Sequence, residues 1–132
     1  VGMLKVEYSA CAGFCSSPRM IQPAGGSSTL LLPKDTTILA DMSAANANAT
    51  VYLPRISLAA GMLTVIALIT ANADTSKKLV IVPATVDSTI NFYDTFSSAY
   101  LTSIVLGEAL ENVTLFCSGR DWIVVRRGWP IA

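Results

Sequence analysis

Three short segments of this 132-residue chain are apolar on both of the faces that a β-strand presents. They are residues 63–69 (LTVIALI), 79–82 (LVIV) and 122–125 (WIVV). A strand with one face in water alternates apolar and polar residues, whereas a strand covered on both faces does not. A chain of this length forms one domain and cannot cover both faces of every strand by itself. We therefore expect a β subunit whose remaining faces are covered by another copy or by a larger surface.

The composition favours the same interpretation. Charged residues make up 14% of the chain and hydrophobic residues 52%, against a usual charged share of about 25%. The longest apolar stretch, residues 58–69, is too short for a membrane-spanning helix, which needs about 20 residues. Nine basic residues balance nine acidic ones, so no net field attracts nucleic acid or an acidic membrane surface. Neither nucleic acid nor a membrane is expected as a partner.

The residue inventory argues against catalysis. The chain has no histidine, which removes the commonest general base and the commonest zinc ligand. Cys11 and Cys15 have the wrong spacing for a zinc or redox motif, and the sequence leaves open whether they are bridged. Cys117 is expected to be a small buried hydrophobe, and reduced thiols fit assembly in a cytoplasm. No phosphate-binding, nucleophile or calcium motif is found, so we expect neither an enzyme nor a cofactor nor a metal.

Short β-type runs recur about every 8–12 residues from residue 29 onward. They are residues 29–32, 36–39, 50–53, 63–70, 78–82, 88–92, 103–106, 112–116 and 122–126. This spacing predicts an all-β domain over residues 29–132 with a short C-terminal tail. We expect a mostly antiparallel sandwich or barrel-like fold that allows one short helix. Residues 72–76 and 118–121 are expected to be hairpin connections, because they are rich in turn-forming residues.

The ends and the apolar stretches carry further expectations. Residues 1–28 contain clustered Ser, Cys, Gly and Pro, which predicts an N-terminal arm that orders on contact with a neighbour. Helix-forming residues in 58–69 and 99–110 make helices the alternative there. β-Branched residues and glycines in both stretches favour strands instead.

A series of short motifs extends over most of the chain. It consists of TVYLP (50–54), AG (60–61) before the apolar run, KLVIVP (78–83), DSTI (87–90), NVTL (112–115), SG (118–119) and WIV (122–124). This series resembles a module of tailed-bacteriophage virion proteins, over about residues 49–125. The chain departs from that module at 118–119, where the module has a polar residue between serine and glycine. Modules of this kind form trimers on phage capsids as decoration proteins or build segments of tail and head fibres.

The resemblance implies a bacteriophage virion structural protein that forms a homotrimer. The first role it implies is a capsid decoration, or cement, protein that stabilises the head by bridging capsomers. Its partners would be further copies of itself and the major capsid protein or other virion proteins. It would be located on the capsid surface after assembly in the host cytoplasm. The alternative is a tail or head fibre module that binds a glycan or receptor on the host surface.

Two sets of residues are candidates for contact with partners. Aromatic and arginine side chains dominate protein interfaces, so the candidate interface residues are Trp122, Arg126, Arg127 and Trp129. The fibre alternative needs aromatic rings beside amides or carboxylates. Its candidate glycan contacts are Asn91, Tyr93, Asp94, Phe96 and Tyr100.

Overall fold

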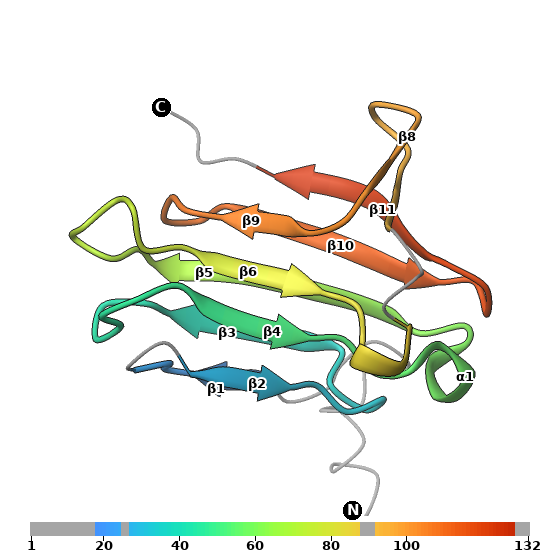
Figure 1. The fold of residues 1–132 in the computed structure, drawn as a ribbon, viewed down its shortest axis with the longest axis horizontal. Helices are drawn as coiled ribbons and strands as arrows, with labels where there is room; N and C mark the ends of the chain where they lie inside the picture. The colour runs from blue at the N-terminus through green and yellow to red at the C-terminus, as the bar shows by residue number, and fades with distance from the viewer. Residues whose placement is uncertain (1–17, 25–26, 88–91, 129–132) are drawn as a thin grey trace, which may run out of the picture.

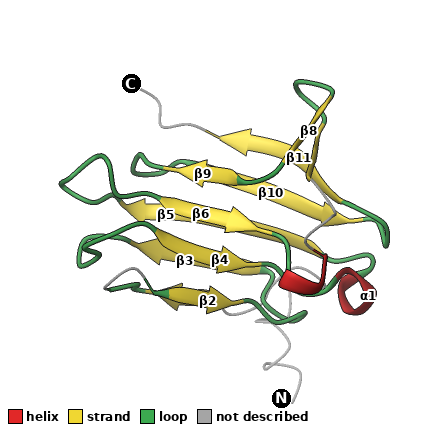
Figure 2. Cartoon of the chain, in the orientation of Figure 1, coloured by secondary structure: helices red, strands yellow, loops and turns green. Residues whose placement is uncertain are grey.

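Two β-sheets stack face to face in the computed structural model, which describes residues 18–24, 27–87 and 92–128 (Figure 1). The seven-stranded sheet contains, in spatial order, β1 (Arg19–Ile21), β3 (Thr37–Asp41), β5 (Leu63–Thr70), β10 (Asn112–Cys117), β11 (Trp122–Gly128), β7 (Phe92–Asp94) and β8 (Ala99–Leu101). The four-stranded sheet contains β2 (Ser28–Leu30), β4 (Ala49–Tyr52), β6 (Leu79–Val82) and β9 (Ile104–Leu106). The described helices are α1 (Ile56–Ala59) and the 3₁₀ turn η2 (Thr85–Asp87) (Figure 2). The predicted all-β class and its allowance for a short helix are confirmed.

The first six strands alternate between the two sheets, so that the chain winds around the core. Strands β1, β3 and β5 lie in the larger sheet, and β2, β4 and β6 lie in the smaller one. Each strand is therefore parallel to the next strand of its own sheet. The β11–β7 pair is also parallel, while β5–β10, β10–β11, β6–β9 and β7–β8 are antiparallel. The expectation of mostly antiparallel pairing was wrong, because this winding places successive strands in different layers.

Successive turns of the winding are joined through the loops at one end of the strands. The Asn72 Nδ2 donates to the carbonyl oxygens of Met42, at 2.8 Å, and of Ala45, at 2.6 Å. The backbone N–H of Lys78 donates to Asn48 Oδ1 at 2.8 Å. These bonds hold the loop after β5 against the loop after β3. Residues 72–76 form a turn as predicted, but they connect two sheets and are not a hairpin.

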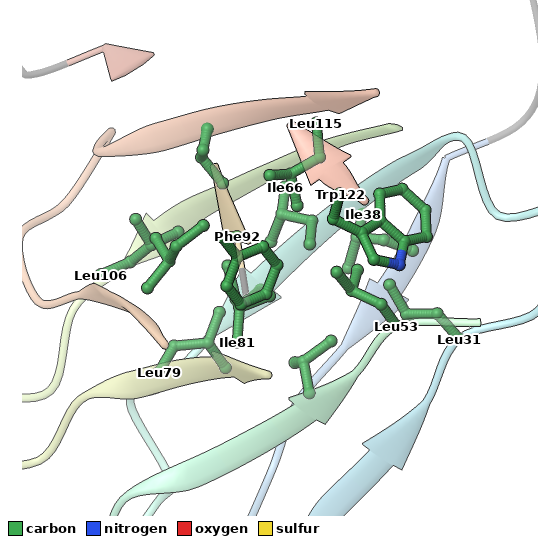
Figure 3. Packing of buried hydrophobic residues seen from close by; sticks show 14 of the residues in the cluster. Leu31, Ile38, Leu53, Ile66, Leu79, Ile81, Phe92, Leu106, Leu115 and Trp122 are labelled. Carbon is green, nitrogen blue, oxygen red and sulfur yellow. The ribbon is translucent and has the colours of Figure 1, made fainter. Parts of the chain in front are cut away.

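The core lies between the two sheets and is filled by alternate residues of the strands. Phe92 and Trp122 are its largest buried rings, and both are fully inaccessible to solvent. Figure 3 shows them among aliphatic side chains that come from both sheets. Cys117 is buried and unbridged, as expected for a small hydrophobic residue. The hydrogen on Trp122 Nε1 has no hydrogen-bond partner among the described residues.

Part of the predicted N-terminal arm belongs to the sandwich. Arg19–Ile21 form β1, which pairs with β3 at the edge of the larger sheet. Arg19 Nη1 donates to Asp35 Oδ2 at 2.8 Å and to the Leu30 carbonyl at 3.0 Å. The Asp35 carboxylate also accepts from the Leu32 N–H at 2.7 Å, so this ion pair ties β1 to the connection between β2 and β3. Cys11 and Cys15 lie outside the described residues, as does most of the strand predicted at 88–92.

Candidate interaction surface

An apolar row crosses five strands on the outer face of the seven-stranded sheet. The strand registers place its members side by side, as Leu63, Phe116, Ile123, Tyr93 and Tyr100, from β5 to β8. Leu63 is 38% exposed and Tyr100 is 60% exposed, and the three residues between them are half-buried. We call these five residues the outer row. It has no charged member, so it forms an uncharged, largely apolar strip across one outer face of the sandwich.

The smaller sheet also has apolar residues on its outer face. Leu30, Tyr52 and Val82 lie side by side on β2, β4 and β6. Leu30 is 68% exposed, and Val105 on the neighbouring β9 is 39% exposed. The prediction that several strands are apolar on both faces is confirmed, because strands β5, β6 and β11 each present apolar residues outward.

The candidate glycan contacts that the structure describes lie on the β7–β8 hairpin, which projects at the top right of Figure 1. Tyr93 and Tyr100 form an edge-to-face pair with ring centroids 5.2 Å apart. Phe96 is 63% exposed in the turn between the strands. Asp94, in contrast, is buried and accepts from the Phe96 N–H at 3.1 Å and the Ser97 hydroxyl at 2.9 Å.

These contacts change the role expected for Asp94. Both oxygens of its carboxylate are engaged within the hairpin, so it holds the turn and does not face a ligand. What the hairpin presents to the outside is aromatic, through Phe96 and Tyr100. Asn91, the remaining member of the candidate set, lies outside the described residues.

A hollow of about 490 Å³ opens beside α1, at the β5 end of the outer row. It is lined by Pro33, Thr36, Thr37, Leu58, Ala59, Ala60, Gly61, Met62, Leu63 and Val65. None of these residues is charged, and Leu58 at its rim is 62% exposed. Gly61, which also lines the hollow, has φ +85° where the chain turns from α1 into β5, a conformation that glycine adopts without strain. Its N–H donates to the Cys117 carbonyl at 2.7 Å, which fixes this turn against the end of β10.

The candidate interface residues are distributed differently from the expectation. Trp122 is fully buried in the core of its own chain, so it cannot contact a partner as predicted. Its position is explained by its pairing with Cys117, which also faces inward. Arg126 is exposed opposite Thr114, and Arg127 is half-buried opposite Val113. Trp129 lies outside the described residues.

Ionisable groups of the described residues serve turns and packing. Burial raises the pKa of the Cys117 thiol, which favours its protonated form. In the described ranges, no three His, Cys, Asp or Glu side chains are grouped to hold a metal ion. No helix within them is long and apolar enough to cross a membrane.

No protein-family model matches the chain, and a search of curated proteins found no significant match.

Sequence reasoning missed the outer row and the hollow. The row joins residues from strands that are far apart in sequence, and only the strand registers bring them together. In the sequence, residues 122–125 are apolar at every position. This pattern indicates that both faces of the strand are apolar, but it does not indicate which face is buried.

Proposed function

We propose that this protein is a structural subunit of a bacteriophage virion that acts through contact and not through chemistry. The observation that carries the proposal is the outer row, an uncharged apolar surface across five strands of a small domain. The motif resemblance to phage virion modules supplies the biological setting. Within that setting, we propose the role of a capsid decoration protein that bridges capsomers.

The mechanism is burial of apolar surface at many repeated contacts. Each Å² of apolar surface removed from water contributes about 25 cal/mol, although the cost of association offsets much of this gain. A shell repeats the same contact many times, so a modest gain at each site adds up. Exposed residues such as Leu30 and Leu63 belong to the surface available for such contacts.

Binding to phage heads tests the proposal. The purified protein is mixed with heads that lack it and with host cells, and both mixtures are sedimented. We expect the protein in the pellet with heads, and we expect those heads to survive heating better than heads alone. If it sediments with neither, the virion role is wrong.

A fibre module is the second candidate, and the β7–β8 hairpin is the observation in its favour. Phe96 and Tyr100 are exposed at its end, as sugar-stacking rings often are. The engaged carboxylate of Asp94 weighs against a glycan site, because a sugar needs polar partners beside the rings. Sedimentation with cells and not with heads would favour this candidate over capsid decoration.

A further inference from the structure

We infer that the β7–β8 hairpin of one copy inserts Phe96 into the hollow beside α1 of a second copy, so that copies join head to tail. This inference rests on the proposed virion role, together with the self-association into a homotrimer that the motif resemblance implies, and it names the two surfaces that carry that self-association. One surface is the hairpin tip, residues 95–98, and the other is the hollow that contains Leu58 and Leu63.

Hydrogen bonds hold the backbone of the hairpin tip that carries Phe96. The Thr95 hydroxyl donates to the Val124 carbonyl at 2.8 Å, which fastens the tip to β11. The buried Asp94 carboxylate binds the Phe96 N–H and the Ser97 hydroxyl. The Phe96 side chain nevertheless remains 63% exposed. Because the backbone of this turn is already ordered, it loses little conformational entropy on binding.

The hollow matches this ring in chemistry. Its walls include Leu58, Met62 and Val65, and no charged residue lines it. A hollow of about 490 Å³ is large enough to receive one aromatic side chain. Aromatic side chains seated in such pockets are the usual anchors of protein interfaces. The hollow can therefore accept Phe96, because its walls are uncharged and include several apolar side chains.

The ring cannot reach the hollow of its own chain. The hollow adjoins β5, while the hairpin contains β8, and β10, β11 and β7 lie between these two strands. At about 4.8 Å per strand, β5 and β8 are about 19 Å apart. Phe96 can therefore enter this hollow only on a second copy, and such a contact joins two different surfaces of the subunit. Contacts of this kind close into rings when the rotation between copies permits, as a trimer requires.

The outer row gives this contact a continuous surface. It begins at Leu63, which lines the hollow, and ends at Tyr100, which lies on the hairpin. A contact between copies that extends along this row would cover apolar side chains that a single chain leaves exposed.

Photo-crosslinking identifies the occupant directly. A benzoylphenylalanine is placed at position 96 of the chain, which is mixed with an equal amount of isotopically heavy wild-type chain and irradiated. We expect mixed light–heavy products in which the heavy peptide comes from residues 56–65. Mixed products that join position 96 to another segment would overturn the inference and leave self-association intact.

A substitution measures the strength of the contact. Phe96→Ala should weaken self-association about 30-fold, as expected for an anchor residue, without loss of folding, because the ring is exposed. Leu110→Ala is the matched control, since Leu110 is 61% exposed and lies outside the hairpin and the hollow. If both variants associate as the wild type does, the inference is wrong but the proposed self-association stands. A protein that stays monomeric at every concentration, and gives no mixed product, would overturn both.

Discussion

Single polar residues in this protein build the turns that hold its surface in place. Asp94 is the clearest case, because its buried carboxylate accepts two hydrogen bonds within the β7–β8 turn. Its position in a short aromatic segment suggested a ligand contact, and only the three-dimensional arrangement shows that both oxygens are used internally. A carboxylate that holds a turn and one that binds a ligand look alike in sequence.

Replacement of Asp94 tests this structural role. Asp94→Ala leaves the Phe96 N–H and the Ser97 hydroxyl without their acceptor, which should cost about 1–3 kcal/mol of unfolding free energy. Asp94→Asn retains an acceptor oxygen for the Phe96 N–H, so its loss should be smaller. Urea unfolding of the two variants measures the difference. Equal stability of Asp94→Ala and the wild type would show that the turn does not depend on the carboxylate.

Asp74, in the loop after β5, should make the stability of the fold depend on pH in the acid range. Hydrogen bonds from the Ser76 hydroxyl and N–H, together with Lys77, lower the pKa of Asp74 to about 2. Because the folded pKa lies below the ordinary value of 3.8, this group stabilises the fold above pH 4. That contribution is lost as the pH falls from about 4 to about 2. Its size is small, because the carboxylate is exposed.

Urea midpoints of the wild type and Asp74→Asn between pH 2 and pH 6 measure this contribution. The variant should lose stability less steeply than the wild type as the pH falls below 4. Parallel curves would show that the loop bonds of Asp74 do not contribute to stability.

At the scale of elements, the two faces of strand β11 have different roles, because one packs in the core and the other lies on the outer face. Ile123 belongs to the outer row and is half-buried, while its neighbour Val124 points into the core and is fully buried. Ile123→Thr should weaken self-association and leave the urea midpoint nearly unchanged. Val124→Thr buries a hydroxyl and should cost about 1–3 kcal/mol of folding stability. If both substitutions lower the folding stability of the single chain equally, the two faces of β11 do not have separate roles in folding and association.

Much of the secondary structure could be predicted from the sequence, but the strand pairing could not. Runs such as 63–70 and 112–116 are rich in β-branched and apolar residues and end at turn-forming residues, which locates strands directly. Residues 72–76 also form the expected turn. The turn residues do not specify which sheet the next strand joins, however, and that choice makes the pairing parallel. The bonds from Asn72 to the preceding loop, which accompany this arrangement, connect residues 27 and 30 positions apart.

The sequence predicted that some strand faces are apolar and exposed, but it did not predict which residues lie on them. The double-sided apolar runs correctly indicated that strand faces remain uncovered in one chain. The same runs could not assign Trp122 to the core, because residues 122–125 are apolar at every position and periodicity then selects no face. Its partner across the β10–β11 pair, Cys117, settles the direction. Burial of Trp122 depends on pairing, which no local pattern encodes.

At the scale of the whole molecule, the two sheets form one core and leave apolar surface on both outer faces. The outer row crosses five strands, about 19 Å at 4.8 Å per strand, and its five members carry no charge. Exposed apolar side chains arranged in this way favour assembly over an isolated subunit.

The molar mass of the protein in solution tests the central claim most directly. The chain has a mass of 13.9 kDa, and sedimentation equilibrium across micromolar concentrations gives the mass of the assembled species. We predict a species of three chains, with dissociation promoted by Ile123→Thr. A mass of one chain at every concentration would contradict the account, because the apolar outer faces would then remain open to water.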